Sequence, residues 1–339
     1  MPEITIEKAV EVLLTSGKGI LAADESFPTI EKRFKALKIP STEESRRAYR
    51  EMLFTTPGLN EFISGVILFD ETIRQQTNEH VRFAEYLLKQ GIVPGIKVDQ
   101  GTVAFGNSTR EKITQGLDGL PQRLEAYRKL GARFTKWRAV IVIGENLPSL
   151  ACVEANAKAL AEFASLSQEA GLIPIVEPEV LMDGNHTIAR CEEVTTLTLK
   201  TVFTALFDHK IVLQKMLLKT GMVLSGTDCP EQAGVDVVAE ATRGCRGLAV
   251  PSAIPGIVFL SGGQAAEDAT VRLNAICQSS DLPWKLTFSF GRALQAPAME
   301  IWNGSRENVV TAQMALHLRA SCNSLAVQGR YSIEKGKKR

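Results

Sequence analysis

Eight short apolar stretches recur along the chain, each bounded by glycine or proline and each ending in polar or charged residues. Apolar runs of four to eight residues with such boundaries are typical of strands that are buried on both faces, and their shortness argues against buried helices. The sequence therefore predicts eight buried strands. They span residues 19–26, 65–72, 93–101, 134–141, 173–180, 216–223, 256–263 and 286–293.

Between these stretches the apolar positions follow helical spacing. One set repeats at intervals of four, three and four, which places its members on one helix face. The set consists of Val153, Ala157, Leu160 and Ala164. Three times a glycine closes a helical segment and a strand follows at once, as suits the left-handed position after a helix end. These glycines are Gly91, Gly131 and Gly171.

The regular alternation of strand and helix predicts an α/β fold, a single (β/α)8 TIM barrel. Each interval between strands is long enough for a loop and a right-handed crossover helix, and such barrels usually have ~250 residues. An open doubly wound sheet is the main alternative, but it carries a glycine-rich turn after its first strand. Here that turn reads DESFPT, without G-x-G-x-x-G.

No linker or composition change divides the chain, so we expect one barrel domain over residues 1–330. The segment from about residue 297 is predicted to form an extended C-terminal helix. A short basic tail is expected over 331–339.

Composition narrows the classes of function. The 339 residues are 45% hydrophobic and 23% charged, with a net charge of +1. This balance gives no reason to expect nucleic acid or a membrane surface as a partner, and no apolar run approaches the ~20 residues that span a bilayer. The six scattered cysteines indicate a reducing compartment. We therefore expect a cytoplasmic protein, with an organellar location after removal of a transit peptide as the alternative.

Charged residues gather at the ends of the predicted strands, where a barrel has its active site. Three pairs of charges stand two residues apart, and in a strand such pairs point to the same face. Any one pair could simply be a salt bridge between strands. Burying the whole set would cost several kcal/mol per ion unless the charges are paired or used. The set comprises Asp24, Lys97, Asp99, Lys136, Arg138, Glu177, Glu179 and Lys219.

Lys219 lies in the apolar run MLLKTGMV and is the candidate nucleophile of Schiff-base chemistry. Alone it would be read as a solvated charge at a strand edge. A lysine amine attacks a carbonyl only when unprotonated, so the usual pKa of ~10.4 must fall toward ~7–8. Apolar neighbours and nearby cations have this effect. Glu177 is the candidate acid for carbinolamine dehydration, and Asp24 the candidate base for carbon–carbon cleavage.

Two further segments predict phosphate binding. FLSGGQ ends the seventh strand, so the amides of Gly262 and Gly263 and the Ser261 hydroxyl can bind a phosphate at a helix N-terminus. Arg292 ends the eighth predicted strand, and loops after strands seven and eight are the common phosphate site of this fold. SGG alone is often only a tight turn. The expected partner is a small molecule with phosphates at both ends, because Lys97 and Arg138 lie across the barrel.

No metal site or cofactor is predicted. The four histidines fall in predicted helices or loops and lack ligand spacing such as H-E-x-x-H. Each is read as a surface or helix residue. They are His80, His186, His209 and His317.

The assembled motifs resemble class I fructose-1,6-bisphosphate aldolases over nearly the whole chain. They include GILAADES, GIKVDQG, KWRAVI, PIVEPE, LLKTGM, FLSGGQ and TFSFGRALQ. The resemblance implies a metal-independent lyase of glycolysis, gluconeogenesis or the Calvin cycle. It would cleave fructose 1,6-bisphosphate reversibly to dihydroxyacetone phosphate and glyceraldehyde 3-phosphate.

The resemblance also implies residue roles. Lys219 would form the Schiff base, Glu177 would be its acid and base, and Asp24 would act at the carbon-4 hydroxyl. Glu179 and Lys136 would assist. Ser261, Gly262, Ser289, Gly291 and Arg292 would bind one phosphate, and Lys97 and Arg138 the other. Lys32 and Arg33 also match family positions near the substrate.

Three departures from the family pattern affect the expectations. The loop after Asp24 reads ES-FPT where many members read ES-TGS, so Thr29 is expected to supply the hydroxyl of a serine. Thr220-Gly221 replaces the proline and asparagine usual in animal enzymes, which changes the backbone after the nucleophile. Animal members end in a tyrosine that helps enamine protonation, whereas the last tyrosine here is Tyr331. We expect cleavage to persist and enamine protonation to be slower.

Other functions stay open at this stage. Sedoheptulose 1,7-bisphosphate is an alternative substrate, and a transaldolase or deoxyribose-phosphate aldolase is an alternative enzyme, although these usually bind one phosphate. A silent sugar-phosphate sensor or scaffold is the non-enzymatic alternative. By family analogy alone, a homo-oligomer, commonly a tetramer, is expected.

Overall fold

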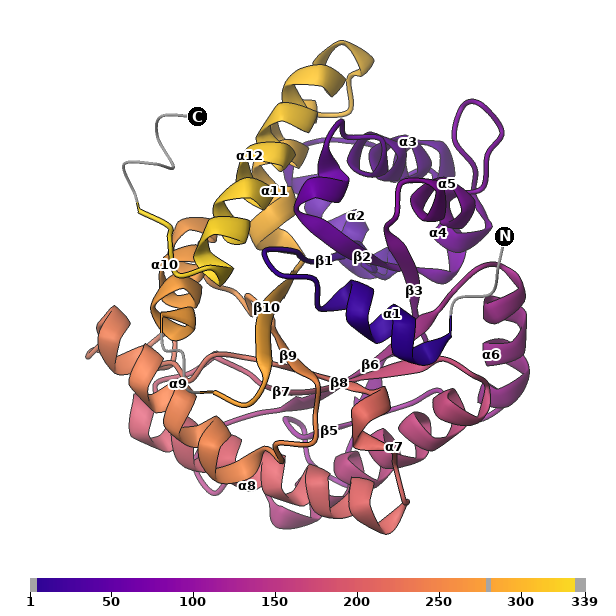
Figure 1. Ribbon diagram of the computed structural model, residues 1–339. Coiled ribbons are helices and arrows are strands. Elements are labelled where there is room, and N and C mark those ends of the chain that lie inside the picture. Colours follow the sequence, from indigo (N-terminus) through magenta and orange to yellow (C-terminus); the bar gives the residue numbers. More distant parts are fainter. Residues whose placement is uncertain (1–4, 279–281, 333–339) are drawn as a thin grey trace.

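The computed structural model describes residues 5–278 and 282–332. Its centre is a closed barrel of eight parallel strands in the order β1-β2-β3-β6-β7-β8-β9-β10, with β10 returning to β1 (Figure 1). All eight predicted strands are confirmed. They are β1 Gly19–Ala22, β2 Ile63–Leu68, β3 Val93–Lys97, β6 Phe134–Ile141, β7 Ile173–Val180, β8 Leu217–Thr220, β9 Gly256–Phe259 and β10 Lys285–Phe290.

Helices surround the barrel and cover the outer faces of its strands (Figure 1). The predicted helix with four-three-four spacing is α7, and all four of its marker residues are buried. Gly91, Gly131 and Gly171 have the predicted left-handed backbone, with φ of 75°, 109° and 74°. The helices are α1 Ile6–Leu13, α2 Phe27–Ala36, α3 Glu43–Phe54, α4 Asp70–Arg74, α5 Phe83–Lys89, α6 Leu120–Lys129, α7 Leu150–Glu169, α8 Ile188–Asp208, α9 Val235–Ala249, α10 Ala266–Cys277, α11 Arg292–Trp302 and α12 Val309–Val327. Short 3-10 turns occupy Leu59–Glu61, Leu213–Lys215 and Arg306–Asn308.

The predicted extended C-terminal helical segment is confirmed and consists mainly of α12. Its first residues belong to α11, which ends before Asn303 and Gly304, because both take left-handed conformations, with φ of 43° and 77°. The expected tail over 331–339 lies outside the described residues from position 333 onward. The antiparallel hairpin of β4 (Thr102–Ala104) and β5 (Lys112–Thr114) was not predicted, since its strands lack an apolar run.

Helix α1 closes the N-terminal end of the barrel. In Figure 1 it lies across the strands, and Ala9, Val10 and Leu13 pack on apolar side chains inside the barrel. Two inward-facing glycines make room for this packing. A Cβ at Gly65 would stand 2.5 Å from Leu13, and one at Gly95 would stand 2.1 Å from the Phe134 ring. This end is therefore filled, and the opposite end is the one that can hold a ligand.

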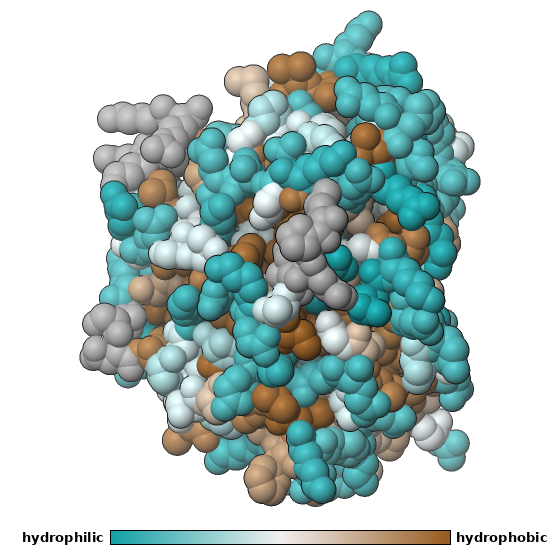
Figure 2. All heavy atoms as spheres, turned by 45° about the vertical axis from the view of Figure 1, so that its right-hand side comes forward, coloured by the Kyte–Doolittle hydropathy of each residue, from teal (hydrophilic) through white to brown (hydrophobic). Residues whose placement is uncertain are grey.

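The surface fits this arrangement. On the face shown in Figure 2, hydrophobic residues lie in separate patches between hydrophilic ones, as expected when each helix turns its apolar stripe toward the barrel. No helix within the described ranges is long and apolar enough to cross a membrane.

Candidate active site

A cavity of about 890 Å³ opens at the C-terminal ends of the strands. It brings together every catalytic and binding residue in the predicted set except Lys32. The residues that line it include Asp24, Arg33, Lys97, Lys136, Arg138, Glu177, Glu179, Lys219, Ser261, Gly262, Gly263, Ser289, Gly291 and Arg292. Lys32 is exposed on α2 and is not among the lining residues.

The strands direct these charges inward by simple alternation. On β6, Phe134 packs in the apolar end of the barrel, and Lys136 and Arg138 follow on the same face. On β7, Ile175 packs there too, and Glu177 and Glu179 follow. The predicted i and i+2 pairing is confirmed on both strands. Several predicted strands are longer than the observed ones. The first was predicted over 19–26, whereas β1 ends at Ala22, and Asp24 lies two residues beyond that end.

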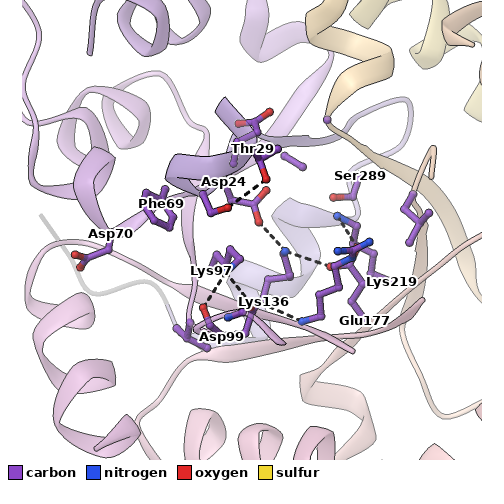
Figure 3. Close-up of a pocket in the computed structure, with 18 of the residues that line it drawn as sticks. Asp24, Thr29, Phe69, Asp70, Lys97, Asp99, Lys136, Glu177, Lys219 and Ser289 are labelled. Atoms are coloured by element: carbon purple, nitrogen blue, oxygen red, sulfur yellow. Dashed lines mark hydrogen bonds and ion pairs between the residues drawn. The ribbon is translucent and has the colours of Figure 1, made fainter. Parts of the chain in front are cut away.

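Three buried groups and the half-buried Asp24 form a row of alternating charge (Figure 3). Lys219 Nζ lies 3.1 Å from Glu177 Oε1, and Glu177 Oε2 lies 3.3 Å from Lys136 Nζ. The same Lys136 ammonium lies 2.6 Å from Asp24 Oδ2. Lys219 can therefore exchange a proton with Glu177, and the Lys136 ammonium holds Glu177 and Asp24 on its two sides.

The row sets the protonation of its members. Burial acts to raise the pKa of Asp24, but the charges of Lys136, Lys219 and Lys97 outweigh it and hold that pKa well below its usual range. Burial also opposes ionisation of Glu177, and Lys136 and Lys219 again lower its pKa. Burial acts to lower the pKa of Lys136, yet Asp24 and Glu177 raise it. Both carboxylates are thus ionised at neutral pH, and Lys136 keeps its charge.

Two further basic residues of the mouth, Lys97 and Arg138, are held by carboxylates. Lys97 Nζ lies 2.6 Å from Asp99 Oδ1, and Arg138 Nε donates to Glu179 Oε2. Burial acts against the charge of Arg138, and Glu179 outweighs it and raises the pKa of the guanidinium. The spacing of Asp99 from Lys97 predicted a shared strand face. That Asp99 is the counter-ion of Lys97 is visible only in the structure.

A candidate anion site lies at the ends of β9 and β10. Gly262 and Gly263 both have positive φ, 57° and 133°, and a Cβ at Gly263 would stand 3.5 Å from Arg292 Nη2. Gly291 is the N-cap of α11, so the positive end of this helix meets the cavity. The buried Ser289 hydroxyl has no hydrogen-bond partner within the described part of the chain. Hydroxyl, helix end and guanidinium together suit a phosphate.

Arg33 is positioned by residues that the sequence patterns did not reveal. Its Nη1 lies 2.5 Å from Glu25 Oε1, and Arg50 Nη2 lies 2.5 Å from Glu25 Oε2. Arg50 is buried on α3. Glu25 follows Asp24 directly, and this adjacency was the one available signal for a second carboxylate at the site.

Several residues that line the cavity were not assigned to the site. Phe69 and Asp70 lie in the predicted strand 65–72, Arg74 lies on α4, and Arg123 and Tyr127 lie on α6. Figure 3 places Phe69 and Asp70 on the side of Lys97 that faces away from Lys219.

The histidines take no part in the cavity lining. Within residues 5–278 and 282–332, no group of three or more histidine, cysteine, aspartate or glutamate side chains could hold a metal ion. The chemistry that the described residues offer is that of amines, carboxylates and guanidinium groups.

A (β/α)8 barrel with a buried lysine between carboxylates, and an anion site after its last two strands, defines a class of lysine-bearing barrel enzymes that act on phosphorylated substrates. The particular family follows from comparison with known proteins. The family model "Fructose-bisphosphate aldolase class-I" matches residues 5–339, and the chain belongs to this family, whose members are lyases.

Related proteins align with this chain over nearly their full length. A protein of Xanthomonas campestris named probable fructose-bisphosphate aldolase class 1 is 52% identical over 96% of this chain and 98% of its own. Cytosolic fructose-bisphosphate aldolase 5 of Arabidopsis thaliana is 50% identical over 96% of this chain and 91% of its own. A solved structure of the Plasmodium falciparum aldolase, in complex with TRAP and a small-molecule inhibitor, superposes with a TM-score of 0.95. It is 46% identical and covers 96% of this chain and 95% of that one.

Proposed function

We propose that this chain cleaves fructose 1,6-bisphosphate reversibly to dihydroxyacetone phosphate and glyceraldehyde 3-phosphate, through a Schiff base at Lys219. The row of alternating charge from Lys219 through Glu177 and Lys136 to Asp24 carries the proposal. It supplies a nucleophile and the groups that move protons, in a cavity with cations at both ends.

Formation of the Schiff base uses Lys219 and Glu177. The Lys219 ammonium gives a proton to the Glu177 carboxylate 3.1 Å away, and the free amine attacks the ketose carbonyl carbon. The N–C bond forms and the carbonyl oxygen becomes a hydroxyl. Glu177 then returns its proton to this hydroxyl, which leaves as water. The product is a protonated imine, so the covalent step keeps the positive charge that Lys219 carried at the start.

Cleavage uses Asp24. Its carboxylate, kept ionised by Lys136, takes the proton of the carbon-4 hydroxyl. The bond between carbons 3 and 4 breaks, its electron pair moves to the iminium and forms an enamine, and the aldehyde leaves. Lys136 stays charged throughout and orients both carboxylates, while Glu179 holds Arg138 beside the row.

The two ends of the cavity suit two phosphates. Ser261, Gly262, Ser289, Gly291 and Arg292 would bind the phosphate of the dihydroxyacetone half. Lys97 and Arg138 would bind the other, each turning part of its hydrogen bonding from Asp99 or Glu179 to the ligand. With both phosphates held, the ketose carbonyl lies against the Lys219 amine. Binding of the two phosphates thereby orients the carbonyl carbon for attack.

Borohydride trapping tests the mechanism directly. The enzyme is incubated with dihydroxyacetone phosphate, reduced with borohydride, digested and mapped by mass spectrometry. We expect one modified residue, Lys219. Modification at another residue, or none, would overturn the mechanism. A parallel assay with EDTA should leave activity unchanged, and loss of activity on chelation would point to a metal-dependent aldolase instead.

We also propose that the protein is a cytoplasmic homo-oligomer, tetrameric by family analogy. The cytosolic plant relatives support the location. Light scattering coupled to size-exclusion chromatography gives the oligomeric state, and a monomer at assay concentration would contradict the expectation.

A further inference from the structure

Arg246 is a fully buried arginine behind the strand that carries Lys219. It lies on α9, its side chain is 2% exposed, and within residues 5–278 and 282–332 it forms no ion pair with a carboxylate. Removing a charge from water costs several kcal/mol when no counter-ion compensates. Stability alone therefore gives no reason for a guanidinium here, since an apolar side chain would pack at lower cost.

The guanidinium contacts the two residues that follow the nucleophile. Arg246 Nη2 donates to Thr220 Oγ1 at 3.1 Å and to the backbone carbonyl of Gly221. Its other terminal nitrogen lies 3.1 Å from Cys245 Sγ. Because strand residues alternate, Lys219 points into the cavity and Thr220 points outward to α9, where Arg246 meets it.

The backbone around Lys219 has a sheet partner on one side only. The pairing of β8 with β7 ends at Leu218, one residue before the lysine, and the pairing with β9 ends at Thr220. Beyond Thr220, residues of α9 bind the backbone. Arg246 binds the Gly221 carbonyl, and Thr242, one turn earlier on α9, accepts a hydrogen bond from the Val223 amide at 3.0 Å.

We propose that Arg246 is a positioning residue for Lys219, which it acts on through Thr220 and Gly221. By holding the end of β8 against α9, it fixes the direction of the lysine side chain toward Glu177. This inference rests on the proposed Schiff-base function. It gives the Thr220-Gly221 step a partner, since the Thr220 hydroxyl and the Gly221 carbonyl are the two acceptors on this step that the guanidinium contacts.

The test compares two arginines of the same helix. Arg246→Met removes both hydrogen bonds to β8. Arg243→Met is the matched control, because Arg243 Nη1 donates to the Ala275 carbonyl on α10 and does not contact β8. For each folded variant, the rate of borohydride trapping with dihydroxyacetone phosphate is measured with kcat and KM.

We expect Arg246→Met to lower the trapping rate and kcat by about 100-fold, as a displacement of about 1 Å does in active sites. Its KM should change by less than about threefold, because the phosphate-binding residues are untouched. Arg243→Met should keep the wild-type trapping rate. Equal rates in wild type and Arg246→Met, or equal losses in both variants, would overturn the proposal.

Two conservative variants decide the matter if Arg246→Met does not fold. Arg246→Lys keeps the charge and one donor, and Thr220→Val removes only the hydroxyl. We expect both to lower the trapping rate by several-fold, at unchanged KM, and wild-type rates in both would refute the positioning role. Wild-type enzyme that is not trapped at Lys219 would instead refute the function on which the inference rests.

Discussion

The two halves of the barrel interior are built from the same strands and follow opposite rules. Toward the N-terminal end the inward side chains are apolar and α1 packs on them. Two residues further along β6, β7 and β8, about 7 Å at the usual rise, the inward side chains are charged. On β8 the change falls between Leu217 and Lys219, and on β7 between Ile175 and Glu177.

The difference separates stability from chemistry within one element. In the lower half, at the N-terminal ends of the strands, close approaches such as Gly95 against Phe134 fill the space, and burial of apolar area stabilises the fold. In the upper half, at the C-terminal ends, charges pair with one another. This pairing offsets the cost of removing them from water and contributes little net stability. Substitutions two residues apart should therefore have different kinds of effect.

The largest effect is expected from Lys219→Met. Loss of the amine removes the covalent route, so kcat should fall by at least about 10⁴-fold. Glu177 keeps Lys136 as its partner, so the variant should stay folded. Steady-state kinetics with thermal unfolding measures both. Activity within about tenfold of wild type would show that the upper half does not depend on this lysine.

Leu217→Ala tests the apolar half of the barrel interior. Leu217 is fully buried, and truncation should lower the free energy of unfolding by about 2–5 kcal/mol through lost burial and a cavity. Urea unfolding measures this loss. The kcat per folded molecule should change by less than about threefold, and a loss of kcat like that of Lys219→Met would join the two halves into one functional unit.

Arg292→Ala tests the rim of the upper half. The guanidinium should contribute a charge-assisted contact to one phosphate, so KM for fructose 1,6-bisphosphate should rise by about 10- to 100-fold. The KM for an unphosphorylated fructose analogue should change far less. Similar changes for both substrates would remove Arg292 from the phosphate site.

The smallest effect is expected in acid unfolding. The folded pKa of Asp24 lies below its ordinary 3.8, so the unfolded chain binds more protons in acid. The stability that Asp24 contributes is present well above pH 3.8 and is lost as pH falls through the folded pKa. The free energy of unfolding of Asp24→Asn should therefore decline less steeply from about pH 5 to about pH 2 than that of wild type. Leu217→Ala should shift the curve without changing its slope.

The sequence predicted the barrel and most of the candidate site because both depend on local patterns. A buried strand with a charge near its end is visible within eight residues, and i, i+2 spacing sets the face. Lys219, Glu177 and Lys136 were grouped on that basis, and the structure places them in one row.

Specific ion pairs escaped the same reasoning. The i, i+2 spacing of Lys97 and Asp99 indicates a shared face but not that the two side chains bind each other. Arg50 as second partner of Glu25 depends on how α3 meets the end of β1 in space. Arg246 stands in a helical segment with ordinary amphipathic spacing, and its burial without a carboxylate is set by packing against β8. Nothing in the local sequence distinguishes such a residue from a solvated arginine.

The row from Lys219 to Asp24 has a consequence for the energetics of turnover. In the proposed mechanism, Lys219 exchanges a proton with Glu177, and Asp24 later gains a proton from the substrate while the iminium loses its positive charge. The sum of charges over the row is therefore the same before and after each step. The reaction thus needs no change in the net charge of this enclosed site while bonds form and break.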